Sequence, residues 1–229
     1  MAKEGTWLAL ESNPEAINKF LNKMNVNIEC EDIFSFDAEF VDFLPRPHLA
    51  VILCYPEYKK VRQITDNIYE KLVEQQKNKI PEGFFFMNQT ISNACGLFSL
   101  IHGLANNGNE QLIGEGCLKQ WLDNAKNLPV EDRSRSLFNC KKIAQAHMEN
   151  ALDGETDVPQ EEDVDHHFIS YVNRNDTLYE FDSSRTFPRS CGPTSEETFL
   201  IDCGKESKKI MDQLQNASFS AMMLHGKCD

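Results

Sequence analysis

The stretch from Phe84 to Gly108, FFFMNQTISNACGLFSLIHGLANNG, constrains the fold of this chain more than any other. It opens with the apolar run Phe84 to Met87, which predicts a short buried strand, and a polar turn follows. Apolar residues then recur at helical spacing from Leu97 to Ala105. They cover most of the helix circumference, so we expect a central helix that is buried on all sides.

Cys95 falls in the first turn of this predicted helix. Ser92 or Asn93 is the expected N-cap, and the residues from Asn106 to Gly108 form the expected C-terminal stop. Free N–H groups and the positive end of the helix dipole favour a thiolate over a thiol at such a position. The pattern therefore predicts a nucleophile presented at a cleft. The alternative is that Cys95 is a small buried hydrophobe, as most free cysteines are.

Composition and charge exclude several functions. The 229 residues are 41% hydrophobic, which predicts one globular domain spanning residues 1–229. The net charge of −13 argues against binding to nucleic-acid phosphates and suits a basic partner. The first six residues lack the apolar core of a signal peptide, and the longest apolar run, Leu49 to Tyr55, is too short to span a membrane. We expect a soluble monomer located in the cytoplasm, or in both the cytoplasm and the nucleus.

Eight cysteines lie singly, at positions 30, 54, 95, 117, 140, 191, 203 and 228. They form no CxxC motif and no close pairing with histidine, which argues against a zinc site or a thioredoxin-like site. Without a secretory signal, a disulfide framework is not expected either. The cysteines other than Cys95 are interpreted as buried or neutral thiols, with Cys228 exposed and oxidisable. A redox-sensing thiol protein is a further hypothesis that rests on the cysteine count alone.

Hydrophobic periodicity predicts a mixed α/β chain. We expect helices over 14–24, 37–43, 58–78, 118–125, 131–138, 141–152 and 194–214, and strands over 32–36, 49–55, 166–172, 177–182 and 219–224. The first helix begins at the Asn13-Pro14 cap, and the last at a capping box, Thr194 to Glu197. The strand over 49–55 is continuously apolar, which indicates burial on both faces. His147 is expected at the surface.

The segment from Glu149 to Asp165 holds eight acidic residues and no lysine or arginine. Because it cannot bury apolar area, it is expected to be a long exposed loop. Such loops are often lids over sites, and an acidic, solvated connector is an equally good interpretation of the composition.

Next comes a predicted hairpin. The run from His166 to Val172 alternates like a half-buried strand, and the run from Thr177 to Asp182 returns as its second arm. Since the arms are antiparallel, the start of the first strand lies opposite the end of the second. Either His166 or His167 is therefore expected within reach of Asp182.

A cysteine at a helix start, followed by histidine and aspartate on a hairpin, has the order of the papain-like cysteine hydrolases. A thiol nucleophile needs a base, and the base needs a partner that fixes its orientation. The reaction also needs donors for the oxyanion, and Gln89 lies six residues before Cys95 on the same turn. The side-chain amide of Gln89 and the backbone N–H of Cys95 could supply two such donors.

Three blocks of the sequence resemble the signature blocks of the ubiquitin carboxyl-terminal hydrolases of the peptidase C12 type. They are QTISNACG over 89–96, His167-Phe168-Ile169, and LYEFD over 178–182 with Phe187-Pro188. The resemblance is to short, single-domain members and covers nearly the whole chain. It implies a papain-like α/β fold, in which a mostly antiparallel sheet is flanked by helices on both sides and the backbone is knotted.

The resemblance also implies roles for four residues and for one loop. Cys95 is expected as the nucleophile, His167 as the general base and acid, Asp182 as the orienting carboxylate, and Gln89 as the oxyanion donor. The segment from Glu149 to Asp165 corresponds to the family's crossover loop, which passes over the active site and limits the size of the leaving group. No metal or cofactor is expected.

Two positions depart from the family pattern. His166 stands where the family usually has an apolar residue, and the match to the His-Phe pair favours His167 as the catalytic histidine. Ser183 replaces the usual glycine after Asp182.

We expect a cysteine hydrolase that removes small or unfolded adducts from the C-terminal glycine of ubiquitin or of a close ubiquitin-like protein, through a thioester acyl-enzyme. The competing hypothesis is a protein that binds and stabilises ubiquitin with little turnover.

Overall fold

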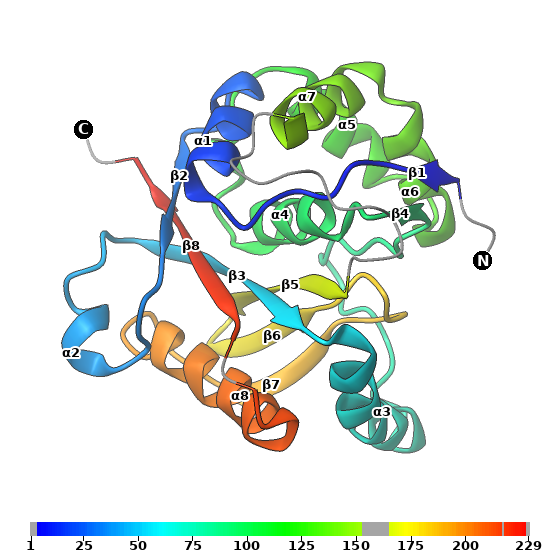
Figure 1. Ribbon diagram of the computed structural model, residues 1–229. Coiled ribbons are helices and arrows are strands. Elements are labelled where there is room, and N and C mark those ends of the chain that lie inside the picture. Colours follow the sequence, from blue (N-terminus) through cyan, green and yellow to red (C-terminus); the bar gives the residue numbers. More distant parts are fainter. Residues whose placement is uncertain (1–3, 153–164, 217, 228–229) are drawn as a thin grey trace.

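A six-stranded antiparallel sheet separates two groups of helices in the computed structural model, which describes residues 4–152, 165–216 and 218–227 (Figure 1). Its strands, in spatial order, are β2 (Ile28–Asp32), β8 (Ser220–Gly226), β3 (His48–Pro56), β5 (His166–Arg174), β6 (Thr177–Phe181) and β7 (Arg189–Pro193). Each pairs with its neighbours in antiparallel fashion. A two-residue parallel pair, β1 (Gly5–Thr6) with β4 (Ile91–Ser92), lies outside this sheet.

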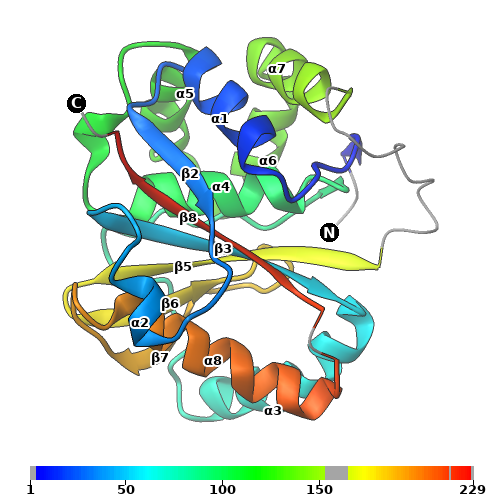
Figure 2. The ribbon, with the colours of Figure 1, turned by 60° about the vertical axis from the view of Figure 1, so that its left-hand side comes forward.

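Helices cover both faces of the sheet (Figures 1 and 2). One face carries α1 (Pro14–Lys23), α4 (Cys95–Asn106), α5 (Cys117–Ala125), α6 (Val130–Asn139) and α7 (Lys141–Leu152), together with a 3-10 turn, Glu110–Leu112. The other face carries α2 (Ala38–Val41), α3 (Tyr58–Glu74) and α8 (Phe199–Leu214). This arrangement confirms the predicted class, an antiparallel sheet flanked by helices. The knot and the single-domain organisation stay predictions.

The central strand β3 is covered on both faces, as its apolar run predicts. Alternate residues point to opposite sides of a strand. Ala50 and Ile52 accordingly belong to the core on the α4 side, whereas Val51 and Leu53 belong to the core on the α8 side. All four side chains are at most 1% exposed. β3 therefore joins two separate cores, and this burial on both faces explains its lack of polar residues.

Every residue of α4 is buried, as predicted. The helix packs closely on β3 at Gly103, where a Cβ atom would lie only 3.0 Å from the Cβ of Ala50. The predicted N-cap is wrong, however. The cap position belongs to Ala94, and Asn93 adopts a left-handed conformation with φ of 61°. Asn93 thus turns the chain before the helix instead of capping it.

The prediction of a strand over Phe84 to Met87 is wrong, although the segment is largely buried. Its backbone groups bond to side chains of α4 instead of another strand. The N–H of Phe85 donates to Oδ1 of Asn106 at 2.9 Å, and the carbonyl of Phe85 accepts from Nδ2 of the same side chain at 2.9 Å. The N–H of Met87 donates to Nε2 of His102 at 3.0 Å. Polar residues of the central helix therefore replace a strand ladder.

The predicted strand over 32–36 begins where the actual one ends. β2 spans Ile28–Asp32, buries Ile28 and Cys30, and pairs with β8 from Gly226 to Met222. Phe34, in the middle of the predicted strand, is 94% exposed. The alternation of apolar Ile28 and Cys30 with acidic residues is the signal that indicates β2.

Two helix boundaries differ from prediction by a full helical turn or more. α3 ends at Glu74 instead of Asn78. α8 begins at Phe199 instead of the predicted capping box, because Thr194 still continues the pairing of β7 beyond Pro193: its N–H donates to the carbonyl of Asp176 at 3.0 Å. A capping motif is therefore not enough to start the helix.

His147 is buried, so its prediction as a surface histidine is wrong. Its Nε2 donates to the carbonyl of Leu8 at 2.9 Å, and its ring packs on Trp7 with centroids 4.8 Å apart. Burial lowers the pKa of His147 to about 4. In the acidic segment, Glu149 and Leu152 belong to α7, and the exposed Asp165 precedes β5. The rest of the predicted loop lies outside the described residues.

Candidate active site

Cys95 is the first residue of α4 and lies at the uncapped start of that helix. Within the described part of the chain, no side chain bonds to the free N–H groups there. The N–H groups of Gly96 and Phe168 donate instead to the Cys95 sulfur. The thiol is 7% exposed. An uncapped helix start is a good environment for an anion, because it carries unpaired donors and the positive end of the dipole.

The β5–β6 hairpin brings His167 to Asp182. The ladder pairs Ser170 with Phe181, so the residue after β6 lies beside the beginning of β5. Nε2 of His167 lies 2.8 Å from Oδ1 of Asp182, and both residues are buried. The neighbouring His166 is exposed. The alternation of the strand thus separates the two histidines, and the one that contacts the carboxylate is His167.

The His167 ring also interacts with the thiol of Cys95. Since Nε2 bonds to Asp182, Nδ1 is the ring nitrogen that is left to interact with the Cys95 sulfur. The helix and the hairpin therefore supply the two halves of one constellation, with the imidazole between a thiol and a carboxylate. This is the arrangement that a cysteine nucleophile, its base and an orienting group require.

The electrostatics of the three groups favour charge separation. Burial raises the pKa of Cys95, but the hydrogen bond and charge of His167 outweigh it, and the pKa falls below its usual value. Burial lowers the pKa of His167, but Asp182 outweighs this effect and raises it to about 10. Burial raises the pKa of Asp182, but the charge of His167 brings it down to about 2. These directions favour a thiolate–imidazolium pair beside an ionised carboxylate.

The side chain of Gln89 is held at both ends of its amide. Oε1 accepts from the hydroxyl of Ser183 at 2.9 Å, and Nε2 donates to the carbonyl of Ile91 at 2.9 Å. An amide nitrogen carries two hydrogens, so one remains for another acceptor. Gln89 and His167 line the same cleft, which has a volume of about 260 Å³. The fourth predicted site residue thus shares a cavity with the predicted base.

Three further residues surround Asp182 and were not singled out from the sequence. Ser184 donates its N–H to Oδ1 of Asp182 at 2.9 Å, and Nε of Arg185 lies 3.6 Å from Oδ2. Tyr58 stacks on the His167 ring with centroids 3.9 Å apart, and its hydroxyl bonds to that of Ser184. Ser184 and Arg185 come shortly after Asp182 in the sequence, and this closeness could have identified them as residues of the site. Tyr58 reaches the site only through the fold.

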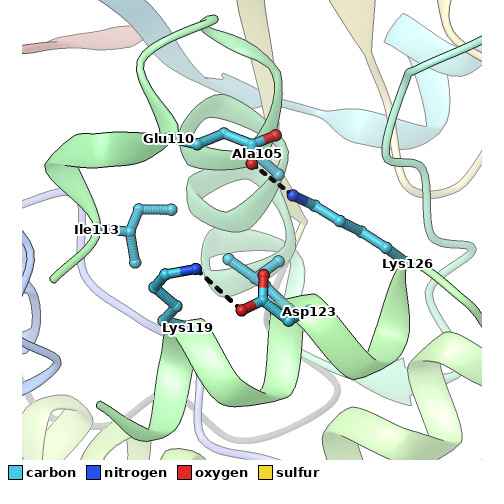
Figure 3. Close-up of a pocket in the computed structure, with 7 residues that line it drawn as sticks. Ala105, Glu110, Ile113, Lys119, Asp123 and Lys126 are labelled. Atoms are coloured by element: carbon cyan, nitrogen blue, oxygen red, sulfur yellow. Dashed lines mark hydrogen bonds and ion pairs between the residues drawn. The ribbon is translucent and has the colours of Figure 1, made fainter. Parts of the chain in front are cut away.

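A smaller pocket lies beside the other end of α4, where Ala105 is found (Figure 3). Two ion pairs cross it, Lys119 to Asp123 at 2.9 Å and Lys126 to Glu110 at 2.6 Å. Its volume is about 10 Å³, which accommodates about one water molecule. A pocket of this size does not compete with the cleft at Gln89 and His167 as a substrate site.

Among residues 4–152, 165–216 and 218–227, no three His, Cys, Asp or Glu side chains are grouped so that they could hold a metal ion. None of the helices in these ranges is long and apolar enough to cross a membrane. The seven cysteines described there are free thiols. Burial raises the pKa of Cys30, Cys54, Cys191 and Cys203, so Cys95 alone among the shifted thiols moves towards the thiolate.

Residues 7–212 match the family model described as "Ubiquitin carboxyl-terminal hydrolase, family 1". A ubiquitin carboxyl-terminal hydrolase of Drosophila melanogaster is 39% identical over 211 residues, which are 90% of this chain and 91% of the relative. Isozyme L1 of Homo sapiens is 32% identical over 220 residues, 94% and 96% of the two chains. The crystal structure of the Trichinella spiralis UCH37 catalytic domain bound to ubiquitin vinyl methyl ester superposes with a TM-score of 0.73. The superposition covers 98% of this chain and 97% of the Trichinella spiralis chain. At 22% identity, it shows a likeness of fold.

Proposed function

The chain belongs to family 1 of the ubiquitin carboxyl-terminal hydrolases, and on this premise we propose that it hydrolyses the bond after the C-terminal glycine of ubiquitin with Cys95 as the nucleophile. The observation that supports this most directly is the contact of one imidazole with both a thiol and a carboxylate. Nε2 of His167 lies 2.8 Å from Oδ1 of Asp182, and the same ring interacts with the Cys95 thiol.

In the acylation step, the Cys95 thiolate attacks the carbonyl carbon of the terminal glycine. The carbonyl π bond opens, and the negative charge collects on oxygen. That oxygen accepts hydrogen bonds from the free Nε2 hydrogen of Gln89 and from the Cys95 N–H at the start of α4. His167 then donates its Nδ1 proton to the leaving amine. The C–N bond breaks, and a thioester between Cys95 and ubiquitin remains.

In the deacylation step, the neutral His167 takes a proton from water. The resulting hydroxide attacks the thioester carbonyl, and collapse of the second tetrahedral intermediate expels the Cys95 thiolate. Ubiquitin leaves with a free carboxylate, and His167 is again the imidazolium. Asp182 keeps the ring oriented in both steps and stabilises its positive charge, so it needs no proton transfer of its own.

A role in ubiquitin binding alone would not need this arrangement. A protein that only holds ubiquitin gains nothing from a buried imidazolium, which costs desolvation unless a carboxylate compensates it. The net charge of −13 also suits the arginine-bearing tail of ubiquitin, because long-range attraction raises the encounter rate. We therefore favour turnover over storage. A preference for small or unfolded adducts, the monomeric state and the cytoplasmic location stay predictions.

The test is cleavage of ubiquitin that carries a fluorogenic amide at its C-terminus. Wild type is compared with Cys95→Ala, His167→Ala and the matched control His166→Ala, which removes the exposed neighbour. We expect turnover in wild type and in His166→Ala and a loss of at least about 10³-fold in the other two. Tight binding of ubiquitin without turnover in wild type would support the binding protein instead.

A further inference from the structure

The imidazole of His167 has an aromatic partner on α3. The ring of Tyr58 lies on it with centroids 3.9 Å apart and an angle of 28° between the planes. This contact lies on the imidazole face, whereas Cys95 and Asp182 bind its edge nitrogens. Rotation about the side-chain torsions of His167 is therefore opposed from a third direction.

We propose that Tyr58 is a positioning residue, which holds the His167 ring in line with Cys95 before any substrate binds and stabilises its charged form through the aromatic face. The assignment deepens the proposed function, since it concerns the same imidazole. It predicts that the site is already aligned in the free protein.

The connection from β3 to α3 places Tyr58 at this position. β3 pairs with β5 so that Tyr55 lies opposite His167. Two residues later, Glu57 takes a left-handed conformation with φ of 49°, and the chain turns into α3. The N–H of Tyr58, the first residue of α3, donates to the carbonyl of Asp165 at 3.2 Å, just before β5. The turn is therefore tied to the start of the strand that carries His167.

The hydroxyl of Tyr58 is anchored on the carboxylate side of the site. It bonds to the hydroxyl of Ser184 and lies 3.5 Å from Oδ2 of Asp182. Burial and the charge of Asp182 raise the pKa of Tyr58, so the phenol remains protonated and can donate. Because Ser184 also donates its N–H to Asp182, ring and carboxylate are linked through one serine. Both the ring and the hydroxyl of Tyr58 are thus fixed relative to His167 and Asp182.

An aromatic face attracts a cation placed over it, and the attraction grows when the pair is desolvated. The charged groups that face the His167 ring are Cys95 from α4 and Asp182 after β6, with Arg185 behind the carboxylate. Tyr58 adds a favourable contact for the imidazolium without adding a charge. Its loss should release the ring and shift the thiolate–imidazolium pair towards the neutral thiol.

The decisive measurement is alkylation of Cys95 by iodoacetamide in the absence of ubiquitin, followed against pH by mass spectrometry of the Cys95 peptide. Tyr58→Leu keeps apolar volume but removes the aromatic face. We expect its Cys95 alkylation near pH 7 to fall about tenfold, with the midpoint of the profile shifted to higher pH. Tyr58→Phe, which keeps the stack and loses the hydroxyl, should fall only about two- to threefold.

The control is Tyr179→Leu, which removes a partly buried ring that packs on Phe84 instead of on the imidazole. It should leave the alkylation profile at wild type. In turnover of the ubiquitin amide, Tyr58→Leu should lower kcat about tenfold at an unchanged KM.

A wild-type alkylation profile in Tyr58→Leu would overturn the proposal, even if the melting temperature fell, because that result would mean a structural role only. A wild-type protein that alkylates normally but does not cleave the ubiquitin amide would refute the proposed hydrolase. The role assigned to Tyr58 would then still be decided by the alkylation profiles.

Discussion

Ser183 donates its hydroxyl proton to Oε1 of Gln89 at 2.9 Å, and its carbonyl accepts the N–H of the same glutamine at 2.8 Å. The residue after the carboxylate of the triad is thereby bonded twice to the proposed oxyanion donor. This explains what the departure from the family's glycine achieves here. A glycine could make the backbone bond but has no hydroxyl to hold the amide oxygen.

Replacing Ser183 with alanine should therefore weaken catalysis through Gln89. A hydrogen bond to Oε1 orients the amide and polarises its N–H groups, which makes the free Nε2 hydrogen a better donor. We expect kcat for the ubiquitin amide to fall about three- to tenfold in Ser183→Ala at constant KM. Ser35→Ala, which removes a hydroxyl that bonds to Asp37 far from the cleft in sequence, is the control. If Ser183→Ala costs the same factor in a Gln89→Ala background, the two residues act independently and the explanation fails.

The pH dependence of stability should reveal the ionised Asp182. Its pKa in the folded protein is about 2, below the usual 3.8, so its stabilising effect is complete above pH 4 and is lost as the pH falls towards 2. The free energy of unfolding should fall by up to about 2 kcal/mol more over this range in wild type than in Asp182→Asn. Urea unfolding at pH 2 to 5 measures the difference. Parallel curves for the two proteins would contradict the ionised pair, and Asp212→Asn, at an exposed position, should follow wild type.

Asn106 should be essential to the segment that leads to Gln89. Asn106→Leu removes the partners of the N–H and the carbonyl of the buried Phe85. Because buried backbone groups without partners are costly, we expect a loss of about 2–4 kcal/mol in the free energy of unfolding. The control is Asn127→Ala, whose exposed side chain bonds only to the carbonyl of Asp123 and should cost less than about 1 kcal/mol. A similar loss in both variants would show that the segment does not depend on Asn106.

A second buried ion pair supports the hairpin that carries Asp182. The guanidinium of Arg189 contacts both oxygens of Glu180, at 2.8 and 2.6 Å, and the hydroxyls of Tyr69 and Tyr171 also bond to that carboxylate. Glu180→Ala leaves the buried cation with only the longer contact to Glu206, at 3.4 Å, so we expect a loss of about 3–5 kcal/mol in urea unfolding. Lys208→Ala breaks only an exposed pair with Asp212 and should cost less than about 1 kcal/mol. A small loss in Glu180→Ala would mean that water reaches Arg189.

The parts of the fold that follow from local pattern could be predicted from the sequence. The apolar run from Leu49 to Tyr55 predicts the central strand, and the helical spacing from Leu97 to Ala105 predicts the buried helix, because burial on all sides requires such residues. The hairpin geometry limits the partner of Asp182 to His166 or His167. Pattern alone cannot choose between them, since alternation says only that the two face opposite ways.

The errors arise where tertiary contacts replace the usual local partners. The run from Phe84 to Met87 has the composition of a strand, but its hydrogen bonds go to the side chains of His102 and Asn106, which a periodicity argument counts as parts of a helix face. His147 is buried because distant residues contact it: the carbonyl of Leu8 accepts from Nε2, and the ring of Trp7 packs on the imidazole. Tyr58 reaches the imidazole through the turn at Glu57, and no spacing in the sequence encodes that contact.

The strand order has a consequence for how the protein is made. Among the described strands, β2 pairs in the sheet with β8 alone, and the central strand β3 lies between β8 and β5. Residues 28–32 emerge from the ribosome early but cannot pair until residues 222–226 have been translated, and β3 has neither neighbour until β5 appears. Two separate cores thus depend on strands that come late in the sequence, so the sheet is completed only when residues 222–226 are available, and slowly, as long-range pairing requires. Until then the apolar central strand β3 lacks its partners, and we expect chaperones to bind it.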